Sequence, residues 1–171
     1  MMKGILAAMA ILAAILCAGH LMGYRLNVTP SLAVGIYRLK DGAPQRGDIV
    51  SFCLAGTAAD LAGKRGYLQP GQCPSGLRPL MKLLAAIPGD QIVILQGGIS
   101  CISPNGFGCI WPISPQKKDR MGRQIHPAHI SGTVPVGMAL VLTSYQGGFD
   151  SRYFGFVPLA ALKKMVPVLT F

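Results

Sequence analysis

The sequence predicts a mainly β protein preceded by one membrane-spanning helix, and three observations support this fold class. Residues 4–24 carry no formally charged side chain. The 22 glycines and 13 prolines of the 171 residues suit short strands joined by turns better than a helical bundle. Beyond residue 25, short apolar runs recur between Gly, Pro and Asp residues, a pattern typical of antiparallel barrels and sandwiches.

The N-terminal apolar stretch is long enough to cross a membrane. At about 1.5 Å per residue, a helix over residues 4–24 spans about 30 Å, the thickness of the hydrocarbon core. A cleaved signal peptide is the alternative, but its apolar region is usually only about 7–15 residues long. We therefore favour a retained anchor over residues 1–25, followed by one domain over residues 26–171.

The apolar runs of this domain predict its strands, which we place at residues 48–54, 80–87, 91–95, 99–102 and 138–143. Residues 88–90 and 97–98 form turn sequences between them. Residues 55–77 are expected to form a glycine-rich surface excursion, and residues 116–129 a polar, basic loop. We expect little helix after the anchor, apart from a turn around residues 159–164.

The charge balance excludes several function classes. The chain has 16 Lys and Arg residues against six acids, for a net charge of +10. All the acids are Asp, so an H-E-x-x-H zinc protease and a deaminase that uses a Glu acid/base are excluded. The basic residues are spread thinly, which favours an anionic membrane surface over nucleic acid as the partner.

Four cysteines lie outside the apolar stretch and indicate an oxidising compartment. Four cysteines allow three connectivities, and Cys53–Cys73 with Cys101–Cys109 is the local choice. The alternatives are four buried free thiols or a zinc site, but neither a C-x-x-C pair nor a suitably spaced His supports zinc. Charges flanking residues 4–24 lean slightly toward a cytoplasmic domain instead, but long domains translocate largely regardless of such charges.

A serine with a lysine base is the catalytic pair that these residues leave open. His126 and His129 stand in a polar stretch, and we interpret both as solvated rather than catalytic. A lysine that acts as a general base must be neutral at the working pH. It therefore requires an apolar setting, which disfavours the ammonium form. Lys82 has two large apolar residues on each side. The alternative is an edge-strand lysine that extends its amine to water.

The candidate serine, Ser31, follows the apolar stretch closely. Pro30 disfavours a helix there, and Gly35 permits an unusual backbone angle. A turn of this kind can expose a hydroxyl beside free backbone N–H groups. The alternative is a plain linker into the first strand.

Three segments, in order, resemble boxes of the type I signal peptidase family, most closely its conjugative-transfer (TraF-type) branch. The first is Thr29-Pro30-Ser31 with Val34-Gly35-Ile36-Tyr37, the second is Lys82 with Pro88-Gly89-Asp90-Gln91-Ile92, and the third is residues 150–158, Asp-Ser-Arg-Tyr-Phe-Gly-Phe-Val-Pro. The resemblance implies that Ser31 is the nucleophile and Lys82 the general base. It also implies that the Thr29 hydroxyl supports the oxyanion.

The third box implies that Asp150 and Arg152 form an ion pair that supports the site. Two positions depart from the family pattern. Ala33 stands where the family usually has Pro, and Gly148 stands where longer members have a Ser that hydrogen-bonds the lysine. Ser144 and Asp150 are therefore the candidates for orienting Lys82.

The resemblance implies a signal-peptidase-like β-barrel or sandwich domain with serine endopeptidase activity, without metal or cofactor. Its expected substrate is an exported precursor protein, specifically a conjugative pilin subunit, with cyclisation through the acyl-enzyme as one outcome. We expect it in the bacterial inner membrane, in contact with lipid, with the catalytic domain on the periplasmic side. The alternatives are a general signal peptidase, a self-cleaving repressor, which would need a helix-turn-helix, and a non-catalytic envelope subunit.

Overall fold

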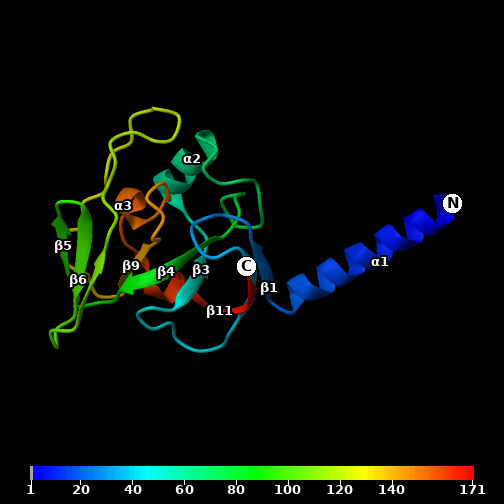
Figure 1. The fold of residues 1–171 in the computed structure, drawn as a ribbon, viewed down its shortest axis with the longest axis horizontal. Coiled ribbons are helices and arrows are strands. Elements are labelled where there is room, and N and C mark those ends of the chain that lie inside the picture. The colour runs from blue at the N-terminus through cyan, green and yellow to red at the C-terminus, as the bar shows by residue number, and fades with distance from the viewer. Residues whose placement is uncertain (1) are drawn as a thin grey trace.

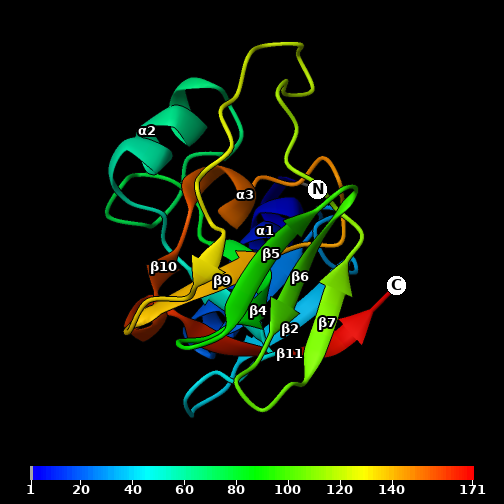
Figure 2. The ribbon, with the colours of Figure 1, turned by 90° about the vertical axis from the view of Figure 1, so that its left-hand side faces the viewer.

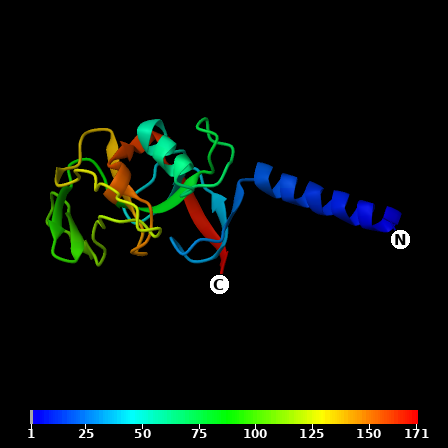
Figure 3. The same cartoon turned by 90° about the horizontal axis from the view of Figure 1, so that it is seen from above.

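A computed structural model describes residues 2–171 and begins with a long isolated helix. Helix α1 (Met2–Leu21) projects from the body, as seen from the side and from above (Figures 1 and 3), and none of its residues is buried. Within residues 2–171 it is the one helix long and apolar enough to cross a membrane, with a mean hydropathy of 2.2. The predicted apolar helix is therefore present, although it ends before Tyr24.

The body is built on a seven-stranded antiparallel sheet in the order β1-β2-β11-β3-β4-β9-β10. Its strands are β1 (Tyr24–Asn27), β2 (Gly35–Leu39), β3 (Ile49–Phe52), β4 (Leu80–Ala86), β9 (Met138–Leu142), β10 (Val157–Pro158) and β11 (Lys163–Thr170). A four-stranded antiparallel sheet lies at the end of the body opposite α1 (Figures 1 and 2). Its strands, in the order β7-β6-β5-β8, are β5 (Gln91–Leu95), β6 (Gly98–Ile102), β7 (Gly108–Trp111) and β8 (Gly132–Thr133).

Strands β4 and β9 supply residues to both hydrophobic cores. Leu84 and Val141 belong to the cluster that packs under the helices, whereas Leu140 and Leu142 belong to the cluster shared with the four-stranded sheet. A strand that is buried on both faces reads as a continuous apolar run. The apolar runs that predicted these two strands therefore also explain why they are central.

The prediction of little helix beyond the anchor was wrong for residues 56–64. Helix α2 (Gly56–Lys64) lies within the segment expected to be an irregular excursion, and Ala59 and Ala62 anchor it to the core. Short helices α3 (Ser151–Phe154) and η1 (Leu159–Ala161) complete the helical content after α1.

Strand β11 was also missed, although it lies between β2 and β3. Lys163, Lys164 and Pro167 interrupt its apolar pattern, and its register with β2 shifts between Pro167 and Leu169. A bulge of this kind accommodates a residue that cannot donate to the ladder.

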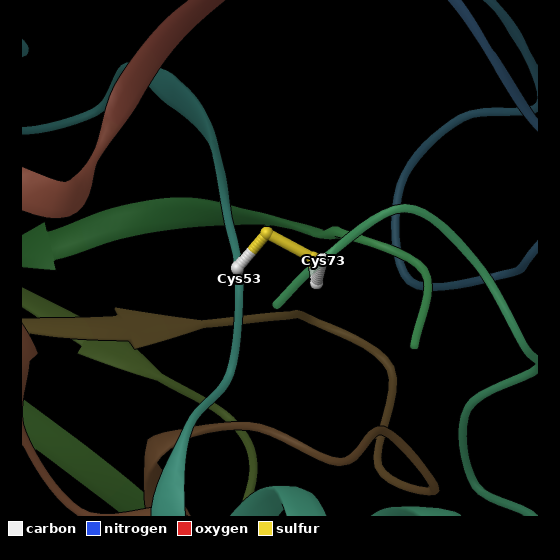
Figure 4. The surroundings of a disulfide bond; sticks show 2 residues. All are labelled: Cys53 and Cys73. Carbon is white, nitrogen blue, oxygen red and sulfur yellow. A yellow bond between two sulfur atoms is a disulfide. The ribbon is translucent and has the colours of Figure 1, made fainter. Parts of the chain in front are cut away.

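One of the two local cysteine pairs forms a disulfide, Cys53–Cys73 (Figure 4). This bond links Cys53, the residue after β3, to Cys73 in the loop that follows α2. It therefore closes the segment over residues 53–73. Cys101 and Cys109 are direct partners across β6 and β7, but both carry free thiols. A disulfide in the body is consistent with the expected oxidising compartment.

We predict that the double substitution Cys53→Ser/Cys73→Ser lowers the free energy of unfolding by about 3 kcal/mol. The bond closes a loop with a sequence separation of 20, and removing such a link releases chain entropy in the unfolded state. Urea unfolding of the full chain in detergent measures this loss. Cys17→Ser, at an exposed position on α1, is the control and should leave the midpoint unchanged.

Candidate active site

The structure brings Ser31 and Lys82 into direct contact. Ser31 lies in the turn between β1 and β2, and Lys82 lies in β4. The Lys82 Nζ is 2.9 Å from the Ser31 Oγ. Lys82 is only 3% exposed, so it is not the solvent-reaching edge lysine that was the alternative.

The turn that carries Ser31 is organised by Asn27, a residue that the sequence analysis did not select. Its buried side-chain amide donates hydrogen bonds to the carbonyl oxygens of Thr29, Leu32 and Ala33 at 3.0–3.1 Å. Local side-chain bonding of this type is what suits Asn to turns. An Asn three residues before Pro30 was therefore an available signal.

Gly35 serves this turn for a reason other than the expected one. Its φ is not positive, so no unusual backbone angle is needed. Instead, a Cβ at this position would lie 2.1 Å from the Leu169 carbonyl oxygen of β11. Glycine is required because two backbones approach closely where β2 begins.

Burial of Lys82 lowers the pKa of its amine from 10.5 to about 8. Desolvation is the main cause, because an apolar setting disfavours the ammonium form. The negative charge of Asp150 raises the pKa and the positive charge of Arg152 lowers it, so these two partly cancel. A substantial fraction of this lysine is therefore neutral near pH 8.

Asp150 and Arg152 form the predicted ion pair, with both side chains fully buried. The Arg152 Nε lies 2.8 Å from an Asp150 carboxylate oxygen. The same guanidinium donates to the backbone carbonyl oxygens of Ser114, Tyr145, Gln146 and Gly148. The pair therefore holds two loop segments together, one at Ser114 and one over residues 145–148. It acts on Lys82 through charge rather than through a hydrogen bond.

Thr143 connects this ion pair to the serine. Its backbone N–H donates to the Asp150 carboxylate at 3.1 Å, and its hydroxyl donates to the Ser31 carbonyl oxygen at 2.5 Å. Thr143 is completely buried. Its place one residue after an apolar strand gave no sequence signal, because the residue that it contacts is 112 positions away.

The other candidates lie nearby with different contacts. Thr29 lines the cavity beside Ser31, but its hydroxyl donates to the Asn27 side-chain oxygen at 2.8 Å. Ser144 is exposed, and within residues 2–171 it makes no hydrogen bond to Lys82. His126 and His129 are both exposed. No group of three potential metal ligands occurs among the described residues.

Ser31 and Lys82 open onto a cavity of about 620 Å³. One side of it is lined by the Ser31 turn and β4, and another by the loop over residues 116–125. This loop rises beside α2 (Figures 1 and 2). A hydroxyl in contact with a buried amine, at the base of a cavity of this size, can form a covalent intermediate with an enclosed substrate.

The chain belongs to the signal peptidase family, peptidase S26, whose family model matches residues 1–168.

Among curated proteins, the chain is 35% identical to the conjugal transfer protein TraF of Agrobacterium fabrum (strain C58), over 90% of this chain and 86% of that one. It is 34% identical to a plasmid transfer protein TraF of Escherichia coli, over 92% and 90% of the two chains. A crystal structure of a signal peptidase I from Enterococcus faecalis V583 aligns with a TM-score of 0.40 and 22% identity. That alignment covers 75% of this chain and 98% of the other.

We predict that the buried amine makes stability depend on pH. Because the pKa of Lys82 is about 8 in the fold and 10.5 in the unfolded reference, the unfolded chain binds more protons between these values. The free energy of unfolding should therefore rise between pH 8 and 10.5, by on the order of 3 kcal/mol from this residue.

Urea midpoints of the full chain in detergent at pH 7 and pH 10 measure this effect against Lys82→Met. The comparison cancels other groups that titrate in this window. An equal pH response of both chains would show that Lys82 titrates normally.

Proposed function

We propose that the chain is a membrane-anchored serine endopeptidase that uses a Ser31/Lys82 dyad to mature an exported precursor, a pilin subunit for conjugation. The 2.9 Å contact between Lys82 Nζ and Ser31 Oγ, made by a lysine that is 3% exposed, carries this proposal. Family membership supports peptidase activity, and the relatives named as transfer proteins support a role in conjugation.

Acylation begins when neutral Lys82 accepts the Ser31 hydroxyl proton. The Ser31 Oγ then attacks the peptide carbonyl carbon, and the C–N bond of the tetrahedral intermediate breaks as the Lys82 ammonium returns the proton to the leaving amine. The pKa of about 8 suits this exchange, because a base works best when its pKa is near the operating pH.

The negative charge that develops on the substrate carbonyl oxygen must be stabilised by hydrogen-bond donors near Ser31. Within residues 2–171 the Ser31 backbone N–H donates to no other atom, so it is available for the oxyanion. The Thr29 hydroxyl lies on the same cavity wall. It can join this role by rotating away from Asn27, its present acceptor.

The acyl-enzyme is released by a second nucleophile that Lys82 deprotonates. Water gives a linear product, whereas the amino terminus of the same precursor gives a cyclic one, and both reactions regenerate Ser31. The two products differ by one water in mass, so the measurement below separates them.

Helix α1 supports attachment to the inner membrane, with the body on the periplasmic side. It is apolar all round and free of contacts along most of its length. The Cys53–Cys73 disulfide favours the oxidising side of that membrane. The helix joins β1 directly, so the Ser31 turn stands close to the lipid surface, where an exported precursor emerges.

We predict that Ser31→Ala and Lys82→Met each reduce precursor cleavage by at least about 10³-fold, because each removes one member of a unit that acts together. Below pH 8 the native rate should fall about tenfold per pH unit, as Lys82 becomes protonated. Intact mass spectrometry of a candidate pilin precursor, incubated with the chain in proteoliposomes, measures cleavage and cyclisation.

Ser144→Ala and Lys163→Met are matched controls at exposed positions outside the cavity, and both should cleave normally. Cleavage that persists in Lys82→Met would exclude this lysine as the base. Broad cleavage of unrelated secretory signal peptides would indicate a general signal peptidase instead.

A further inference from the structure

The cavity that holds Ser31 and Lys82 is strongly cationic. Besides Lys82, its lining includes one carboxylate, Asp119, against five cationic side chains: Arg65, Arg78, Lys118, Arg120 and Arg123. With Lys82 counted, the lining therefore holds more than a third of the 16 basic residues and one of the six acids. A cleft lined by one sign of charge concentrates ligands of the opposite sign.

Asp119 organises this wall rather than neutralising it. Its carboxylate accepts hydrogen bonds from the Tyr67 hydroxyl at 2.6 Å and from the Arg123 Nε at 2.7 Å, and lies 3.6 Å from Arg65. These bonds hold the pKa of Asp119 well below its usual range, so it stays charged. Asp119 pairs with two arginines, Arg65 and Arg123, so the net charge of the three side chains is still positive.

Arg120 is held in place without an acid. Its guanidinium lies 5.3 Å from the centre of the Tyr145 ring and donates to the Tyr145 hydroxyl. Within residues 2–171, no carboxylate lies within ion-pair distance of Arg120, Arg78 or Lys118. A guanidinium held against an aromatic ring keeps donors free for a planar carboxylate.

We propose that this wall recognises acidic side chains of the precursor segment that lies beside the cleavage site. The inference rests on the proposed function, because it assigns a substrate class to the same cavity. A peptide is favoured over a lipid headgroup, because the cations share their cavity with the Ser31 hydroxyl. Whatever they bind therefore occupies the cavity that also holds the nucleophile.

Binding to the full Ser31→Ala chain in detergent tests this proposal without requiring cleavage. The probes are two fluorescent synthetic peptides of identical sequence, one with two Asp residues flanking an Ala-Ala centre and one with Asn in their place. We expect the Asp peptide to bind at least about tenfold more tightly, and high salt to reduce the difference.

The adjacent lysines provide a matched pair. Lys118→Gln and Arg120→Gln should each reduce the Asp/Asn affinity ratio about threefold or more, whereas Lys117→Gln, outside the cavity lining, should not change it. Equal binding of the two peptides would overturn the proposal and leave the peptidase untouched. A ratio insensitive to Lys118→Gln and Arg120→Gln, with weaker binding of both variants to phosphatidylglycerol vesicles, would overturn it in favour of lipid.

A separate observation concerns how Ser31 is positioned. A Cβ at Gly148 would lie 2.3 Å from the Thr143 Cγ2, so the threonine methyl group occupies the space that a side chain at residue 148 would need. The Thr143 hydroxyl meanwhile bonds the Ser31 carbonyl oxygen. A residue with a γ-methyl group at position 143 therefore requires glycine at position 148.

We infer that Thr143 is a positioning residue, which holds the nucleophile turn against β4 so that the Ser31 Oγ meets Lys82. This too rests on the proposed function. Its hydroxyl acts on the backbone of Ser31, and its own backbone is held by Asp150. A chain of contacts thus runs from Arg152 through Asp150 and Thr143 to the serine.

Thr143→Val keeps the shape and removes the hydroxyl, so we expect kcat on the precursor to fall at least about tenfold with KM and the pH midpoint near 8 retained. Thr143→Ser should restore most of the rate. Native kinetics in Thr143→Val would overturn the inference. Cleavage that persists in Ser31→Ala would instead overturn the proposed function.

Urea unfolding supplies a second measurement that does not depend on activity. Gly148→Ser should lower the unfolding midpoint in the native chain, because its Cβ meets the Thr143 methyl group. In a Thr143→Ser background, which lacks that methyl, the loss should be smaller. Equal losses in both backgrounds would overturn the linkage between the two positions.

Discussion

A lysine amine that is neutral near pH 8 can exist here only where water is kept away from it. Strand β4 meets this condition because it lies inside the large sheet, between β3 and β9, with Leu84 in one core and Ala85 in the other. Two hydrophobic clusters and a buried ion pair thus form the surroundings of the Lys82 side chain. Asp150 moderates the outcome, since its charge raises the pKa of Lys82 while desolvation lowers it.

The parts of this molecule that sequence could predict are those with local signals. Continuous apolar runs located β4 and β9, and the flanking apolar residues singled out Lys82. Other features depend on distant partners. Strand β11 has an interrupted pattern and is recognisable only from its pairing with β2 and β3. Thr143 meets Ser31 from 112 positions away. Asn27 bonds locally and could have been recognised, whereas the close approach at Gly35 required the position of β11.

The third box contributes mainly through the buried side chains of Asp150 and Arg152. Arg152 donates to four carbonyl oxygens as well as to Asp150, so the loops on the far wall of the cavity share one buried cation. Buried charges need partners of this kind, because an unpaired guanidinium would be very costly. The same loops present Tyr145 to Arg120, so the interior ion pair and the cationic wall are parts of one arrangement.

The central place of β11 has a consequence for the order in which the protein is made. Strand β2, which begins four residues after Ser31, pairs with β11, and the Phe171 N–H bonds the Val34 carbonyl oxygen. During synthesis the serine emerges early, but its turn lacks this support until β11 has been translated. The Ser31 turn should therefore reach its folded arrangement only late in synthesis, after the earlier strands are available.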